Sequence, residues 1–242
     1  MLKSPIAMLA LTTALLSLPG LASAHASWIG QHGGDFVVVH GEGSATNEAY
    51  DPTIVTEPKG FDKTGAPVAV ALAPQAKVMG LGVPEGVAVV SVLYSDGWWT
   101  EDAKGEWRNE PADAYPDFKG TGQYFTYPVA YIAATDTQKP VGHKLEIVPL
   151  ADPTKLAMGD KLEVQVLLDG NPVKGVAVTN DVLTDWDISS TVTDDEGKAL
   201  VTIANNGLNV LQYYHEVQIS EKEIAGHQAV LSFVAHGPEE EE

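Results

Sequence analysis

The segment KLEVQVLLD, residues 161–169, decides the fold class, because its apolar side chains fall on every second position. Leu162, Val164, Val166 and Leu168 share one parity, and the polar residues Glu163 and Gln165 separate the first three from one another. A period of two is typical of a β-strand that buries one face. The segment therefore predicts a strand at the surface of a packed core.

Similar short apolar runs recur along the chain, and turn sequences such as SDG, LDGNP and NNG separate them. The chain also contains 23 Gly and 15 Pro, and no long run has a helical period. This pattern favours an all-β fold built from β-sandwiches. The further runs that predict strands are 35–40, 66–72, 86–94, 124–133, 175–182, 198–204, 209–219 and 228–236.

The strand pattern divides near Val141, and we expect two sandwich domains on either side of it. The predicted N-terminal β-sandwich domain covers 25–141, and an Ig-like or transthyretin-like sandwich covers 142–236. An acidic tail, 237–242, follows. Residues 95–127 are rich in aromatic side chains, and we expect an irregular loop whose tryptophans cover a core edge. A single larger sandwich remains the alternative to two domains.

The first 24 residues have the features of a secretory signal peptide. Lys3 precedes an apolar run, Pro19-Gly20 interrupts that run, and Ala22-Ser23-Ala24 supplies the small residues that signal peptidase requires. The run is too short for a membrane span, which needs roughly 20 apolar residues. Cleavage after Ala24 would make His25 the first residue of a periplasmic protein whose mature chain does not insert into the membrane.

Composition narrows the classes of partner and site. The formal net charge is −19 and becomes −20 once Lys3 leaves with the signal peptide, so nucleic acid is an improbable partner. The chain has no cysteine, which excludes disulfides, thiolate metal sites and cysteine nucleophiles. The absence of disulfides in an exported protein suggests that it resides in a bacterial envelope. No nucleophile-elbow or phosphate-loop motif is present, and we expect no catalytic residues.

His25 and His40 are the leading candidate metal ligands. A terminal histidine offers its α-amine and its imidazole to one metal ion. If residues 25–40 form a hairpin that turns at His32-Gly33, His25 lies directly opposite His40, and opposed side chains share one face of the sheet. The two histidines would then form a histidine-brace arrangement. A register slip of one residue would separate them.

The other histidines have weaker cases. His143 lies at the predicted domain junction, where ligand sites are common, and His215 lies in a strand beside two tyrosines. Both are kept as candidate metal ligands. His32 falls in the predicted turn, and we expect it to be solvated, whereas His227 and His236 have the pattern of ordinary exposed histidines.

Several stretches resemble the DUF4198 family, which is often described as the periplasmic component of cobalt or nickel uptake systems. The resemblance spans nearly the whole mature chain, and LEIVPLADP is its most specific part. It implies nickel or cobalt handling in the periplasm and carries over no ligand set. The stretches that carry it are HASWI (25–29), VVVHGEG (37–43), LYSDGWWTEDAKGEWRN (93–109), 141–178 and TDDEGKALVTI (193–203).

Three functions from different classes fit the sequence. The leading one is a non-enzymatic periplasmic protein that binds a divalent transition metal, nickel or cobalt, and assists its uptake by an ABC- or ECF-type transporter through contact with the membrane subunits. The second is a structural or adhesive β-sandwich module without a metal. The third is a copper enzyme built on an amino-terminal histidine brace. Imidazole and amine donors suit nickel, cobalt, copper and zinc alike, so the sequence leaves the metal open.

Overall fold

The computed structural model describes residues 25–41, 43, 47–184 and 190–236, and it confirms the all-β fold. The predicted signal peptide and acidic tail lie outside the described residues. In the described residues, helical structure is limited to three short 3₁₀ turns, Pro52–Ile54, Ala112–Ala114 and Pro153–Lys155. No helix in this part of the chain is long and apolar enough to cross a membrane.

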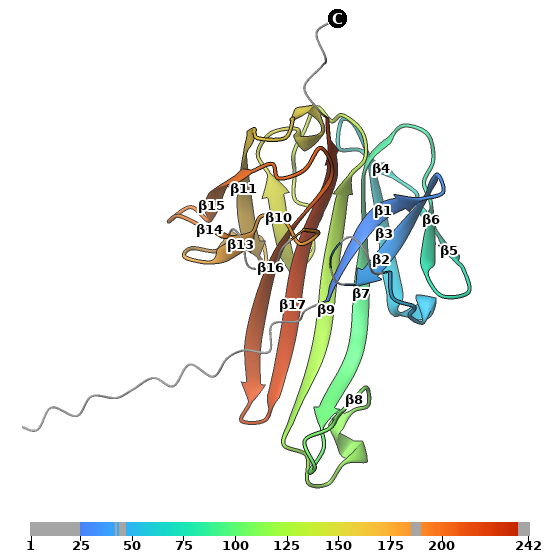
Figure 1. Cartoon of the computed structure of the whole chain (residues 1–242), viewed down its shortest axis with the longest axis vertical. Coiled ribbons are helices and arrows are strands. Elements are labelled where there is room, and N and C mark those ends of the chain that lie inside the picture. The colour runs from blue at the N-terminus through green and yellow to red at the C-terminus, as the bar shows by residue number, and fades with distance from the viewer. Residues whose placement is uncertain (1–24, 42, 44–46, 185–189, 237–242) are drawn as a thin grey trace, which may run out of the picture.

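A nine-stranded sheet forms the centre of the molecule, and its longest strands run side by side in Figure 1. The short strand β8 (Trp107–Arg108) pairs with β7 outside the main path. The other strands, in spatial order, are β14 (Ser190–Val192), β13 (Ala177–Thr179), β16 (Gly207–Ser220), β17 (Glu223–Ala235), β9 (Gly120–Tyr131), β7 (Val87–Glu101), β3 (Val55–Asp62) and β4 (Pro67–Val68).

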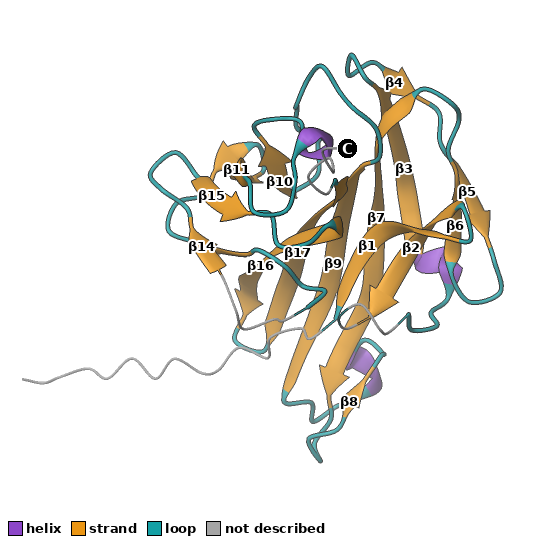
Figure 2. Ribbon diagram, turned by 45° about the horizontal axis from the view of Figure 1, so that its top comes forward, coloured by secondary structure: helices purple, strands orange, loops and turns teal. Residues whose placement is uncertain are grey.

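Two smaller sheets complete the fold. One has the order β1 (Ala26–His32), β2 (Asp35–Gly41), β6 (Met79–Gly82) and β5 (Ala71–Pro74). The other joins β10 (Leu145–Pro149), β11 (Lys161–Leu168) and β12 (Asn171–Pro172), and β15 (Lys198–Thr202) also pairs with β11. Figure 2 shows β1 crossing the long strands of the central sheet, and β10 and β11 at the upper left of these strands.

The smaller sheets pack on opposite faces of the central sheet, which gives three layers. Consecutive residues of a strand point to opposite faces, and Val89 and Val90 of β7 accordingly belong to different cores. Val89 packs with the β10–β11 sheet, whereas Val90 packs with the β1–β2 sheet. In β11, Leu162 and Val164 are fully buried in the first of these cores, as the alternation predicts.

Strands from both sides of the predicted boundary at Val141 share the central sheet. β9 precedes the boundary and β17 follows it, yet the two pair in parallel from Thr121–Glu223 to Tyr131–Phe233. Side chains of β1 also pack against β16 and β17, through Trp28 among others. The two halves of the chain are thus joined by backbone hydrogen bonds, and the division at Val141 remains a prediction.

The aromatic stretch 95–127 is less irregular than its composition suggests. β7 continues through Trp98 and Trp99 to Glu101, and β9 begins at Gly120. A bulge between Ser95 and Gly97 interrupts the pairing, and Gly97 has a φ of +77°, which glycine adopts without strain. The long strands consequently extend past the cores and carry aromatic side chains beyond the β1–β2 hairpin.

The predicted turn of the β1–β2 hairpin was wrong by one residue. Gly33 and Gly34 occupy its two central positions with φ values of +62° and +96°. A two-residue turn that needs positive φ at both positions selects glycine strongly. The turn at Gly33-Gly34 pairs His32 with Asp35, so His40 lies opposite Ser27 and not opposite His25.

Candidate metal centre

His25 and His40 converge despite the error in register. The turn shift moves the partner of His40 by two residues, from His25 to Ser27. Because side chains alternate with a period of two, a shift of two keeps His25 on the same face. It becomes the diagonal neighbour of His40, and the two ring centroids lie 5.3 Å apart with the planes 14° from parallel.

Polar and aromatic contacts fix the orientation of His40. Its Nδ1 atom lies 2.9 Å from Oγ of Ser27, the residue directly opposite on β1. Besides stacking on His25, the His40 ring stacks on the ring of Tyr94 of β7, with ring centroids 5.0 Å apart. A hydrogen bond at one ring nitrogen determines which nitrogen serves as a metal ligand. When Nδ1 carries the proton and donates to Ser27, Nε2 of His40 is the nitrogen left for a metal ion.

Glu48 completes a cluster of three donors. One of its carboxylate oxygens, Oε1, lies 3.1 Å from Nε2 of His25, and its backbone N–H donates to the carbonyl of His40 over 2.7 Å. One donor atom from each of His25, His40 and Glu48 lies within 4.8 Å of the others. Donors of one transition-metal ion sit about 2.0–2.2 Å from it, so small side-chain rotations would close the cluster around an ion.

His40 is suited to metal binding near neutral pH because it stays unprotonated. Burial and, to a smaller extent, the nearby His25 lower the pKa of its imidazole to about 4, and Glu48 opposes the shift. A metal ligand must give up its proton before it binds. His40 therefore binds without releasing a proton at pH 7, and the adjacent carboxylate of Glu48 supplies negative charge for a cation.

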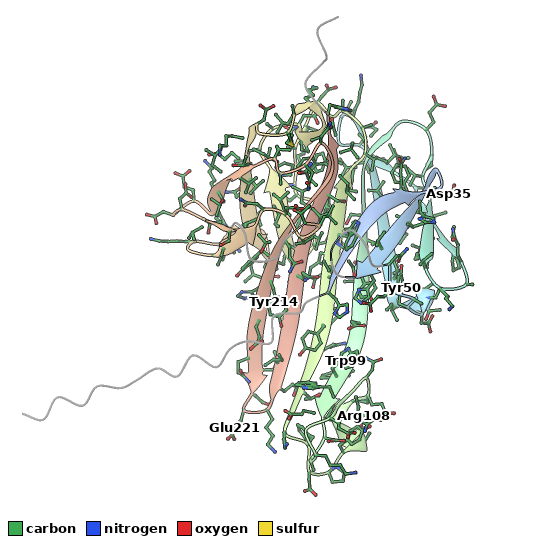
Figure 3. All side chains as sticks on the ribbon, viewed as in Figure 1. Asp35, Tyr50, Trp99, Arg108, Tyr214 and Glu221 are labelled. Atoms are coloured by element: carbon green, nitrogen blue, oxygen red, sulfur yellow. The ribbon has the colours of Figure 1, made fainter. Side chains whose placement is uncertain are left out.

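A cavity of about 560 Å³ opens beside the three donors. Its far wall comes from the extended part of β7, where Trp99 donates its indole N–H to the carboxylate of Asp96 over 2.9 Å. Tyr50 forms the wall next to the hairpin; its hydroxyl donates to the Val38 carbonyl over 2.7 Å. In Figure 3, Tyr50 lies near the hairpin and Trp99 lies further along β7, toward β8.

The other two candidate ligands, His143 and His215, do not join this cluster. Thr126 lines the cavity, whereas the next residue of β9, Tyr127, points to the opposite face and packs against His143 at a centroid distance of 5.2 Å. His143 is buried and its Nε2 atom contacts Oγ of Ser91. The half-buried His215 contacts the Tyr213 hydroxyl over 3.1 Å.

The expectation that His227 is exposed was wrong, whereas His32 and His236 are exposed as expected. His227 lies directly opposite His215 in the β16–β17 pairing, and only 5% of its surface is accessible. Its Nδ1 atom lies 2.9 Å from the Tyr127 hydroxyl, and its ring stacks on Phe125. Burial lowers the pKa values of both His143 and His227 to about 4, so these rings are neutral in the core.

Glu48 and the cavity residues of β7 are the functional candidates that sequence reasoning missed. Glu48 lies eight positions beyond His40, in a polar stretch with no strand pattern. Its contact with His25 depends on tertiary structure and has no signal in the sequence. Asp96 and Trp99 belong to the stretch expected to be irregular. Among the residues that the structure describes, no second group of three histidine or acidic side chains gathers this closely.

Among comparisons with known proteins, only a family model matches the chain. No curated protein and no solved structure matches the chain. A family model described as a domain of unknown function, DUF4198, matches residues 22–217. That match covers most of the sequence, including every residue of the donor cluster, and the chain therefore belongs to the DUF4198 family.

Proposed function

We propose that this protein is a periplasmic, non-enzymatic metal-binding protein that assists the uptake of nickel or cobalt. In this proposal the signal peptide is removed after Ala24, and His25, His40 and Glu48 hold one divalent ion. The ion then passes to the membrane subunits of a transporter. The choice of nickel or cobalt follows the sequence resemblance, because imidazole and carboxylate donors also suit copper and zinc.

The convergence of three donors from distant positions carries the proposal. His25 directly precedes β1, His40 lies in β2, and Glu48 comes from the loop that follows β2. Their imidazoles and carboxylate are a common ligand set for transition metals. The Ser27 hydroxyl orients His40 in the way that hydrogen-bond partners orient metal-binding histidines.

Removal of the signal peptide would add a further donor. Once His25 is the first residue, its α-amine can bind the same ion as its imidazole, and both donors belong to one ordered residue. Its backbone is already held in place, because the Gln228 side chain on β17 donates to the His25 carbonyl over 3.3 Å. After cleavage the site would offer an amine, two imidazoles and a carboxylate to one ion.

Calorimetric titration of Ni²⁺ and Co²⁺ into the mature chain, 25–242, tests this function. We expect one ion per chain for the unaltered protein and at least hundredfold weaker binding, about 2.7 kcal/mol, for His40→Ala. His215→Ala removes a half-buried histidine from the opposite face, and its affinity should match that of the unaltered protein. Equal affinity in His40→Ala and the unaltered protein would contradict the proposed site.

A further inference from the structure

We infer that the cavity beside the donor cluster receives a metal ion already bound by a small organic chelator of amino-acid size. The inference rests on the metal site proposed above, and it concerns the form in which the ion arrives. Three features of the cavity carry it: its size, the chemistry of its walls and the number of protein donors at its edge.

The cavity is too large for the ion alone. A water molecule occupies about 30 Å³ in the liquid, so an ion with its first water shell needs roughly 200 Å³. The cavity measures about 560 Å³, which falls within the range of pockets that hold organic ligands, about 300–1,000 Å³. The remaining space extends from the donors toward Trp99 and Trp107.

The walls suit an organic ligand that carries positive charge. Five of the residues that line the cavity are aromatic, namely Tyr50, Tyr94, Trp99, Trp107 and Tyr124. Aromatic faces bind planar groups by stacking and attract cations. The charged side chains among the described lining residues, apart from the histidines, are the carboxylates of Glu48 and Asp96. Anionic chelates would therefore be repelled, and neutral or cationic ones accepted.

Asp96 gives the cavity a fixed acceptor. The indole N–H of Trp99 holds one carboxylate oxygen, Oδ2, over 2.9 Å. The carboxylate can still accept hydrogen bonds from an amino or imidazole N–H of a ligand, because two oxygens provide several acceptor positions. A chelator that reaches from the ion to Asp96 would then be oriented at both ends.

The donor count leaves room for such a chelator. The His25 amine and imidazole, the His40 imidazole and the Glu48 carboxylate are four protein donors, so a six-coordinate ion keeps two positions open to another molecule. An amino acid with a side-chain donor can fill two adjacent positions with two of its three donors, the amine, the carboxylate and the side chain. Histidine bound to Ni²⁺ in a one-to-one complex has these donors, a planar ring and a single positive charge, so it is the probe for the experiment.

Equilibrium dialysis of the mature chain against labelled L-histidine, with and without equimolar Ni²⁺, tests the inference. We expect about one histidine retained per chain when Ni²⁺ is present and none when it is absent. Trp107→Ala should lower histidine retention at least tenfold relative to Ni²⁺ retention. Trp107 is 40% exposed, so its loss should leave the fold intact. Trp98→Ala is the matched control, because its neighbour Trp99, and not Trp98, lines the cavity.

The outcomes separate this inference from the proposed function. Retention of Ni²⁺ with no retained histidine contradicts the inference and leaves the metal site standing. Equal losses of histidine in Trp107→Ala and Trp98→Ala also contradict it, because the cavity wall would then have no specific role. Failure of the unaltered chain to retain Ni²⁺ in either form contradicts the proposed function and, with it, the inference.

Discussion

The histidines on the two faces of the central sheet differ in what surrounds their rings. His143 and His227 lie in the core between the central sheet and the β10–β11 sheet, here called the main core, where hydroxyl groups contact one ring nitrogen of each and aromatic rings pack beside them. His25 and His40 lie at the edge of an open cavity, beside the exposed carboxylate of Glu48. Similar residues therefore have different roles: hydrogen bonding within a core on one face and candidate metal binding on the other.

The comparison shows that a lowered pKa does not by itself identify a metal site. Burial is the main cause for His40, His143 and His227 alike, and each pKa falls to about 4. What distinguishes His40 is access to a cavity and two further donors close to it. The following predictions use variants on the two faces, and then pH, to test this distinction.

His143→Ala should produce the largest change in stability. The substitution leaves a hole in the core and removes the partner of the fully buried Ser91 hydroxyl, and together these should lower the free energy of unfolding by about 3 kcal/mol. Urea denaturation measures this loss. His215→Ala, at a half-buried position, should cost about 1 kcal/mol.

Both variants should keep the Ni²⁺ affinity of the unaltered protein. If the His143→Ala protein is folded at pH 7 but no longer binds Ni²⁺, the metal site lies on the main-core face. The roles assigned to the two groups of histidines would then be exchanged.

An extra glycine before His25 should weaken metal binding at least tenfold, about 1.4 kcal/mol, without changing the fold. The added peptide bond removes the α-amine as a donor and leaves the imidazole in place. Calorimetric titration of Ni²⁺ measures the loss. A glycine added after Glu242 controls for the extra residue, and equal affinity in both extended proteins would exclude the amine from the site.

Acidification should produce a gradual loss of stability in the metal-free protein. The pKa values of His143 and His227 are about 4 when folded, below the usual 6.5. Between these values the unfolded chain binds more protons than the folded chain, so the free energy of unfolding decreases as the pH falls from about 6.5 toward 4. Above pH 6.5 these two groups add no pH dependence.

His143→Gln should reduce this pH dependence by about half, because glutamine does not titrate and His227 still does. Urea denaturation at pH 7 and pH 5 measures the change in each protein. Parallel losses in His143→Gln and the unaltered protein would show that His143 does not contribute to the acid sensitivity.

Much of the fold could be predicted from local patterns. Alternation in segment 161–169 identified β11 and its buried face, since one strand's periodicity is a local property. The pair His25–His40 could also be predicted, because strand parity keeps both on one face even when the turn is misplaced by one residue. The Gly33-Gly34 sequence contained the correct register, since glycine at both central positions is typical of a tight hairpin turn.

Other parts of the site depended on contacts between distant segments. Glu48 reaches His25 through a loop whose path has no periodic signal. The burial of His227 depends on β17 lying between β16 and β9, and its sequence neighbours do not reveal that position. For the same reason, local patterns could not show that β9 and β17 pair across the predicted boundary at Val141.

The sequence by itself determined the all-β class, the strands with strong alternation and the shared face of His25 and His40, because these depend on backbone geometry over a few residues. Only the tertiary structure decided that Glu48 joins these two histidines, that His143 and His215 lie apart from them, and that Trp99 and Trp107 line a cavity beside them. Those arrangements arise when sheets stack and long strands pair side by side. The packing of whole layers therefore divides the histidines between a core and an open site.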